Sequence, residues 1–115
     1  MNIEDNIKSI LKRLNKFTSN SPKAIAYEKI TLTPGTVKTL TVPANANYAK
    51  LRITSALTTV CAYYLEHNQD PSVASVIGIP LMHLDIFDVT DTQNLSNFKI
   101  DGDGILHVQY FNMQF

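Results

Sequence analysis

Few side chains in this 115-residue sequence have the type and spacing that covalent chemistry needs. The single cysteine, Cys61, could act as a nucleophile only with a histidine beside it in an exposed cleft. It lies instead in the middle of an apolar, strand-like stretch, and free cysteine is among the most frequently buried residue types. We therefore predict a buried, unreactive thiol. A single cysteine also excludes an internal disulfide.

The histidines and acidic residues do not indicate a metal site. His67, His83 and His107 are far apart in the sequence and show none of the short spacings of local metal motifs. The segment Asp101-Gly102-Asp103-Gly104 has two acidic residues of a calcium loop but lacks the third and the closing glutamate. That segment is more typical of a tight turn. We expect neither a metal nor any other cofactor.

A pair of carboxylates could support acid–base catalysis, as in glycoside hydrolases. The candidates are Asp85, Asp88 and Asp91, but their spacing more simply marks the polar positions and the exit of a strand. The sequence contains no glycine-rich phosphate loop and no Gly-x-Ser-x-Gly motif. We predict that the protein is not an enzyme, and a small hydrolase that uses Asp85 or Asp88 is the alternative.

A polar segment, residues 66–75, could contact a sugar or a cell-surface ligand. Sugar sites usually place flat aromatic rings beside polar groups, and this sequence has no tryptophan. Tyr63 and Tyr64 are adjacent, so in a strand their side chains point to opposite faces and only one points outward. A solvated connection is the simpler interpretation of this segment. The residues that could form a ligand loop are Tyr64, Glu66, His67, Asn68, Gln69 and Asp70.

From residue 28 onward the apolar residues alternate with a period of two, which is typical of strands. Between residues 48 and 53, for example, Ala49, Leu51 and Ile53 share one face, and Tyr48, Lys50 and Arg52 share the other. Asp101–Gly104 is the clearest hairpin signal, between the last two strands. The strands are predicted at 28–33, 37–42, 48–55, 58–65, 76–79, 84–89, 98–100 and 105–111. With no second helix pattern, seven or eight short strands indicate a mainly β fold, an antiparallel β-sandwich or jelly roll.

The first 17 residues instead follow a helical period. The apolar residues of this segment recur at intervals of four and three, as in the seam of a coiled coil. They are Ile3, Ile7, Ile10, Leu14 and Phe17. Asn2 suits the N-cap of an amphipathic helix, and the run from Thr18 to Pro22 ends it. The predicted organisation is a helix at 1–17, a linker at 18–25 and a β-sandwich domain at 26–115.

The apolar stripe of the predicted helix must be buried against a partner, because helices this short are marginally stable alone in water. We favour self-assembly of the helix or its docking into a groove of another protein. Packing on the chain's own sandwich and binding to a lipid surface are alternatives. Isoleucine at three seam positions is compatible with a trimer, so we expect a homo-oligomer, with the trimer as one candidate state.

The formal net charge is zero, from ten basic and ten acidic residues, but the charges are unevenly distributed. Residues 1–24 contain five basic and two acidic side chains, whereas residues 25–115 contain five basic and eight acidic ones. The zero net charge argues against nucleic acid as a general partner. No apolar run reaches the ~18 residues of a membrane span, and the N-terminus lacks the pattern of a signal peptide. Neither nucleic acid nor a membrane is an expected partner.

The order of strands and turns in residues 27–111 carries a family resemblance. Residues 30–53 contain a strand, a short turn, and a strand ending in Val42-Pro43-Ala44, followed by an alanine and a tyrosine before the next strand. A proline loop at 70–72, a glycine and apolar pair at 78–81, and strands at 95–100 and 106–111 follow. This pattern resembles small all-β structural proteins of tailed bacteriophages. The sequence departs from that pattern after Leu81, where the usual Gly-Asp turn is absent.

The resemblance implies a non-enzymatic virion component, such as a capsid decoration protein, a head-fibre protein or a tail accessory protein. The implied partners are other capsid or tail proteins, and the implied location is the virion after assembly in the bacterial host cytoplasm. The family supplies no catalytic residues. The alternative from a different class is a β-sandwich module that binds a glycan or a cell-surface ligand.

Overall fold

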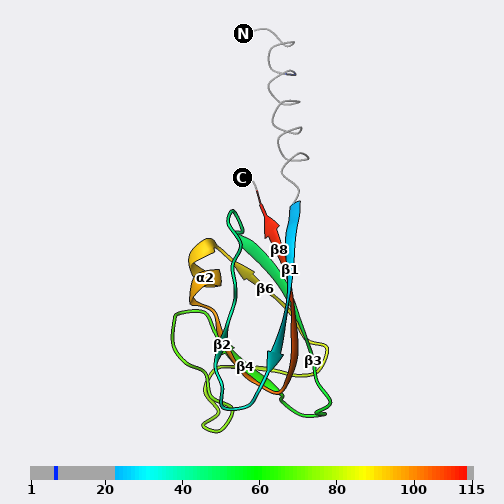
Figure 1. Cartoon of the computed structure of the whole chain (residues 1–115), viewed down its shortest axis with the longest axis vertical. Coiled ribbons are helices and arrows are strands. Elements are labelled where there is room, and N and C mark those ends of the chain that lie inside the picture. The colour runs from blue at the N-terminus through cyan, green and yellow to red at the C-terminus, as the bar shows by residue number, and fades with distance from the viewer. Residues whose placement is uncertain (1–6, 8–22, 114–115) are drawn as a thin grey trace.

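The computed structural model describes residue 7 and residues 23–113, and the latter form two antiparallel four-stranded sheets (Figure 1). The strand order is β1-β8-β3-β6 in one sheet and β2-β7-β4-β5 in the other. The elements are β1 (Lys23–Leu32), β2 (Lys38–Thr39), β3 (Tyr48–Thr54), β4 (Ala62–Leu65), β5 (Ile79–Leu81), β6 (Ile86–Thr90), α2 (Thr92–Asn97), β7 (Lys99–Gly102) and β8 (Gly104–Asn112). The prediction of a mainly β fold with seven or eight antiparallel strands is confirmed, since the structure has eight.

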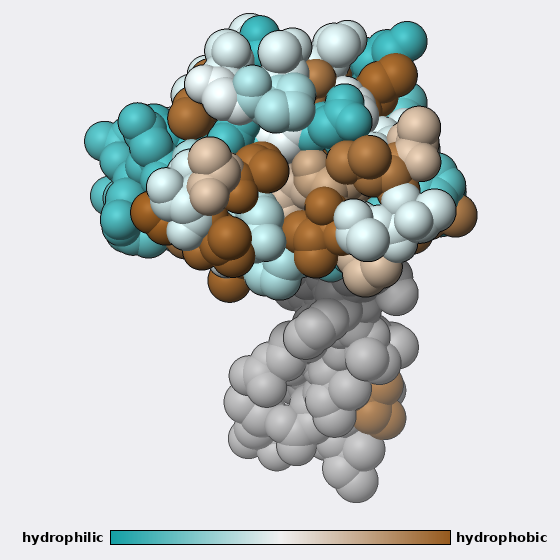
Figure 2. Space-filling model, turned by 90° about the horizontal axis from the view of Figure 1, so that it is seen from below, coloured by the Kyte–Doolittle hydropathy of each residue, from teal (hydrophilic) through white to brown (hydrophobic). Residues whose placement is uncertain are grey.

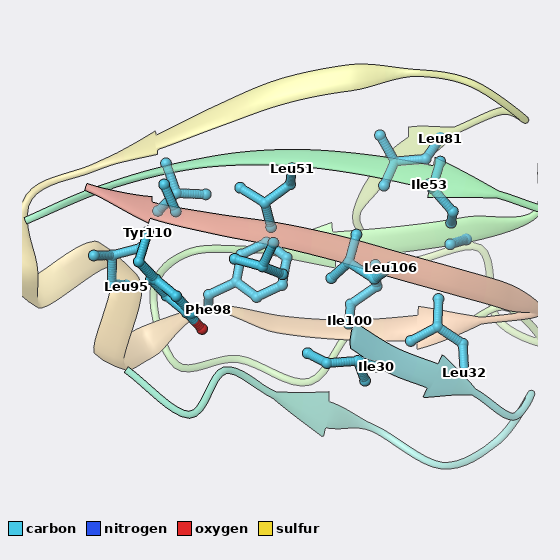
Figure 3. Close-up of a cluster of buried hydrophobic side chains, with 14 of the residues drawn as sticks. Ile30, Leu32, Leu51, Ile53, Leu81, Leu95, Phe98, Ile100, Leu106 and Tyr110 are labelled. Carbon is cyan, nitrogen blue, oxygen red and sulfur yellow. The ribbon is translucent and has the colours of Figure 1, made fainter. Parts of the chain in front are cut away.

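The hydrophobic core lies between the two sheets. Alternation along β3 buries Ala49, Leu51 and Ile53 completely, as the period-two pattern predicts. Leu106 and Val108 of β8 are also completely buried. Ile100 of β7 meets Leu106 from the other sheet (Figure 3). All of these side chains belong to one continuous cluster. The two sheets therefore share a single core and form a β-sandwich.

Three stacked aromatic rings extend this core. The ring centroids of Tyr64 and Phe87 are 4.5 Å apart, and those of Tyr64 and Phe98 are 5.5 Å apart. Phe87 comes from the β1-β8-β3-β6 sheet, and Tyr64 comes from the β2-β7-β4-β5 sheet. The stack therefore links the two sheets and turns the Tyr64 side chain inward.

The predicted hairpin at Asp101–Gly104 is wrong. β7 and β8 follow one another in the chain, but β7 lies in the β2-β7-β4-β5 sheet and β8 in the other sheet. The short connection at Asp103 therefore crosses between the two sheets instead of joining two paired strands. Gly104 allows the chain to cross here, because its φ of +133° is a backbone conformation that favours glycine.

The short helix α2 and the position of β5 also differ from the prediction. α2 has only six residues, which is too short to show a helical period. It begins after Asp91, whose side chain accepts a hydrogen bond from the backbone N–H of Gln93, and it buries Leu95. Residues 73–76, which overlap the strand predicted at 76–79, form a turn, and β5 begins only at Ile79. Val76 cannot continue a strand there because its φ is +55°.

The predicted N-terminal helix and its seam residues lie outside the described residues, with the exception of Ile7. Ile7 has helical backbone conformation and is 51 % exposed. β1 begins at Lys23, inside the linker predicted at 18–25, because Lys23 and Ala24 already pair with β8. Within residues 23–113, no helix has the length and apolar character needed to cross a membrane.

Candidate functional site

The structure places Cys61 in the core, as predicted. Its side chain is only 2 % exposed, and its Sγ donates a hydrogen bond to the carbonyl oxygen of Leu81 at 3.4 Å. Burial raises the pKa of the thiol, which disfavours the thiolate that a nucleophile requires. Cys61 is therefore a packing residue.

The three histidines lie in separate places, each beside a different partner. The Nε2 of His67 lies 2.7 Å from the Oε1 of Gln69, and the Nδ1 of His83 accepts a hydrogen bond from the backbone N–H of Ser55. His107 lies beside Tyr27. Across residues 23–113, no three His, Cys, Asp or Glu side chains are grouped closely enough to hold a metal ion.

The acidic residues considered for catalysis serve as local hydrogen-bond acceptors. Asp85 accepts a bond from the backbone N–H of Met82 at 2.7 Å, which closes the turn before β6. Asp88 accepts a bond from the hydroxyl of Tyr48 at 2.8 Å, and Asp91 caps α2. These contacts account for the positions of the three carboxylates around β6.

The structure brings most of the predicted ligand loop together but turns its aromatic residue away. Glu66, His67, Asn68, Gln69 and Asp70 follow β4 on one exposed loop, whereas the Tyr64 ring is stacked in the core. The loop is fixed by a bond from the backbone N–H of Asn68 to Asn97 and by an ion pair of 2.9 Å between Asp70 and Lys99. A sugar contacting this loop would therefore meet polar groups without the Tyr64 ring.

Glu66 gives this loop a measurable pH dependence. Burial raises its pKa above the ordinary value of 4.5, so the folded state binds a proton more tightly than the unfolded state. Its contribution to stability is complete below pH 4.5 and is lost as the pH rises through the higher folded pKa. The variant Glu66→Gln should lose this part of the pH dependence and melt slightly above the unmodified protein at pH 7. Thermal unfolding followed between pH 4 and pH 8 measures both effects, and an unchanged profile would contradict them.

A different set of residues gathers on the outer face of the β1-β8-β3-β6 sheet. The strand register aligns Tyr27, Gln109 and Lys50 in one row across β1, β8 and β3. It aligns Lys29, His107 and Arg52 in the next row. Because side chains alternate along each strand, these residues point away from the core that their neighbours fill. We call this surface the basic face, defined by Tyr27, Lys29, Lys50, Arg52, His107 and Gln109.

The basic face differs in charge from the rest of the sandwich. Lys29, Lys50 and Arg52 are exposed on it, and one carboxylate, that of Asp88, shares the outer surface of these four strands. Among residues 23–113 the only ion pair joins Lys99 to Asp70, so these three cations make none with the described residues. With Asp88 included, the outer surface of these four strands has a formal charge of plus two, whereas residues 25–115 as a whole contain eight acidic and five basic residues.

A shallow hollow of about 270 Å³ lies on the basic face between Tyr27, Arg52 and Ile86. Tyr27 is 57 % exposed, and its hydroxyl lies 2.7 Å from the Nδ1 of His107. The two ring centroids are 6.2 Å apart, so the rings lie end to end through this contact and His107 does not cover a face of the Tyr27 ring. Gln109 is held in place because its Nε2 donates to the carbonyl oxygen of Ala26 at 2.7 Å. The hollow thus combines an exposed aromatic ring with fixed polar groups and cations.

Sequence reasoning found only one strand of this surface. The alternation in residues 48–53 places Tyr48, Lys50 and Arg52 on one face. Tyr27 and His107 are 80 positions apart, and only the pairing of β1 with β8 brings them together. Only a correct prediction that β1 pairs with β8 would have shown that all six residues share one face.

Comparison of the chain with protein-family models, with characterised proteins and with solved structures finds no match. The resemblance to structural proteins of tailed bacteriophages therefore stays a prediction.

Proposed function

We propose that the chain is a non-enzymatic structural protein of a tailed-phage virion. In this proposal it is a capsid decoration, head-fibre or tail accessory component, which assembles through an amphipathic helix at residues 2–17. The sandwich is then the part that the assembled protein displays. The proposal rests on the family resemblance together with the exposed apolar surface of the sandwich.

The exposed apolar surface is the observation that carries the proposal. Seven large apolar side chains between residues 57 and 86 are at least 40 % exposed. They are Leu57, Val76, Ile77, Ile79, Met82, Leu84 and Ile86. Figure 2 views the end of the sandwich farthest from the start of β1 and shows apolar side chains spread over it. Extended apolar surface on a small domain is typical of a protein that contacts other proteins.

Two of these exposed residues are held in a strained backbone conformation. Val76 has a φ of +55° and Leu84 a φ of +74°, in the left-handed region that branched side chains rarely adopt. Such strain costs about 1–3 kcal/mol per residue and is most often found where a surface has a function. Leu84 is fixed because its N–H donates to the carbonyl oxygen of Ile53 at 2.8 Å. The strain supports a contact surface at these loops.

The two ends of the sandwich could make two different contacts, one with other copies of the chain and one with a second virion protein. The N-terminal segment joins the sandwich where β1 begins, whereas the loops after β3 and before β6 lie at the other end (Figure 1). One end can then hold the oligomer, and the other can meet a second virion protein. Virion components are repeated by symmetry, so a small contact surface on each copy is used many times.

Removal of residues 1–20 tests the assembly part of the proposal. The truncated protein should keep the far-ultraviolet spectrum and melting behaviour of the β-sandwich but sediment as a smaller species than the full chain. The double substitution Ile10→Asp and Leu14→Asp should have the same effect, because it places charge in the apolar stripe. The control, Ser9→Asp with Asn15→Asp, adds the same two negative charges outside the stripe and should leave the oligomer intact.

Incorporation into particles tests the virion part. Phage particles produced with the full chain should contain it, and particles produced with residues 21–115 alone should lack it. Normal incorporation of the truncated protein, or particles that never contain the full chain, would contradict the proposal.

A further inference from the structure

We propose that the basic face is a binding site for an acidic saccharide, with the hollow beside Tyr27 receiving one sugar ring. This inference concerns the outer face of the β1-β8-β3-β6 sheet, which shares only Ile86 with the exposed apolar residues named above, so it does not depend on the helix. It also differs from the ligand loop around residues 66–70, which the sequence indicated. The argument below uses the charge, the exposed ring and the size of the hollow.

The charges of the basic face favour an anionic ligand. Lys50 and Arg52 come from the same strand and face the same side, and Arg52 lines the hollow together with Lys50. Arginine binds a carboxylate through two parallel hydrogen bonds, which gives both affinity and orientation. Lys29 lies beside His107 in the register, outside the lining of the hollow, and adds positive charge on the other side of β8. No described carboxylate competes for these cations through an ion pair.

The aromatic and amide groups favour a sugar over a simple anion. The apolar C–H side of a sugar ring packs on a flat aromatic ring, and the Tyr27 ring is exposed at the rim of the hollow. The contact of its hydroxyl with the Nδ1 of His107 holds the Tyr27 ring, so the orientation of Tyr27 is fixed before any ligand binds. The Oε1 of Gln109 can accept a bond from a sugar hydroxyl, because its Nε2 is already used by Ala26.

The size of the hollow argues against nucleic acid. Single-stranded nucleic acid is typically bound along a positively charged groove with successive aromatic platforms, one for each stacked base. The hollow of about 270 Å³ has a single aromatic ring in its lining, that of Tyr27, apart from the imidazole of His107. This volume is at the small end of ligand sites and suits a single sugar ring with one acidic group.

Other parts of the same protein fit the basic face less well. The N-terminal 24 residues have a formal charge of plus three, so their charge opposes docking on a basic face. The acidic residues of a second copy are distributed over several loops, at Glu66, Asp70, Asp91 and Asp103. Among the described residues of this face, Tyr27 and Ile86 are the large apolar side chains that are strongly exposed. Stable protein interfaces bury about 800 Å² on each partner around an apolar centre, which this face does not offer.

Calorimetric titration of the full chain with oligogalacturonate, oligosialic acid and the methyl ester of oligogalacturonate tests the inference. The ester keeps the same sugar rings but has no charge. At least one acidic oligosaccharide should bind, and its ester or neutral counterpart should bind at least about tenfold more weakly, since a charged hydrogen bond is lost. Polyglutamate and oligothymidylate of similar charge serve as acidic polymers without sugar acids.

Single substitutions locate the site. Arg52→Gln and Tyr27→Ala should each weaken binding by about tenfold or more, because one removes the carboxylate partner and the other the ring. Lys38→Gln removes the same charge from the β2-β7-β4-β5 sheet and should change the affinity less than twofold. Amide chemical shifts should change on β1, β8 and β3 when the saccharide is added.

Several results would overturn the inference. Failure of both acidic oligosaccharides to bind at millimolar concentration would do so, as would equal binding of the methyl ester. Equal or tighter binding of polyglutamate or oligothymidylate would show that the face responds to charge alone or to nucleic acid. A change of oligomeric state caused by Arg52→Gln would indicate instead that a second copy covers this face.

Discussion

The variant Gly102→Ala should unfold with a free energy lowered by about 3 kcal/mol or more. A Cβ atom at position 102 would clash with the Cβ of Ala62 and would lie 2.5 Å from the carbonyl oxygen of Cys61. Ala62 is the first residue of β4, and Cys61 precedes it. Because β4 pairs with β7, these atoms cannot move away without opening the sheet. Since small domains are stable by about 5–15 kcal/mol, the loss is a large fraction of the total. Urea unfolding followed by circular dichroism measures it.

Gly35→Ala is the matched control for this glycine. Gly35 lies in the turn after β1 with a φ of +87°, and a Cβ atom there would meet nothing within 4 Å. The expected loss is about 1–2 kcal/mol, from the left-handed conformation alone. Equal losses for the two variants would show that backbone conformation, and not the contact with β4, determines the effect at Gly102.

Asp101→Ala should also lower the free energy of unfolding by about 3 kcal/mol or more. The carboxylate of Asp101 is 3 % exposed and accepts hydrogen bonds from the backbone N–H groups of Gly35 at 2.8 Å and Val73 at 2.9 Å. A hydrogen bond to a charged group contributes about 1.5–3 kcal/mol, and the alanine variant leaves both N–H donors without their acceptor. These two bonds attach the turn after β1 and the loop after β4 to Asp101 of β7. The turn and the loop should therefore loosen together in the alanine variant. Amide hydrogen exchange at Gly35 and Val73 reports the loosening.

Two further aspartate variants separate the role of these bonds from a general loss of charge. Asp70→Ala breaks the exposed ion pair with Lys99 and should cost about 1 kcal/mol or less. Asp101→Asn keeps one carbonyl oxygen in place of two carboxylate oxygens, so it should lie between Asp101→Ala and the unmodified protein. A loss for Asp101→Ala no greater than that for Asp70→Ala would contradict the proposed role of the buried carboxylate.

Much of the strand framework could be predicted from the sequence because one face of each strand is buried. In β3 and β8 the alternation is regular, and Leu51 and Val108 are completely buried as the pattern requires. The turn at Pro34 and Gly35 could also be predicted, because Pro-Gly is typical of a turn and Gly35 has the positive φ that such a turn requires.

Local sequence could not show which sheet a strand joins. Asp101–Gly104 has the composition of a hairpin turn, yet its glycines are required by close contacts with β4 and with the end of β3. The turn at residues 73–76 has apolar residues that suit a strand, but it is held by the long-range bond from Val73 to Asp101. Both errors arise because tertiary contacts override the local preference of a few residues.

The candidate site was only partly predictable for the same reason. The polar loop at residues 66–70 was recognised from composition, but the orientation of Tyr64 depends on packing against Phe87 and Phe98. The basic face needs residues from β1, β3 and β8, and their alignment follows from strand register. A period-two pattern assigns a residue to one side of its strand, and it does not identify the neighbouring strand.

The pairing of β1 with β8 has a consequence for the order of events during synthesis. Lys23 pairs with Asn112, so the first strand of the sandwich must wait for the synthesis of β8, the last strand of the sandwich, before it gains its partner. Pairings this distant in the chain fold slowly, and β1 stays an unpaired edge while the ribosome completes the protein. The N-terminal segment leaves the ribosome well before β8 does. If the proposed assembly through that segment holds, copies made on one messenger RNA would associate before any sandwich has closed.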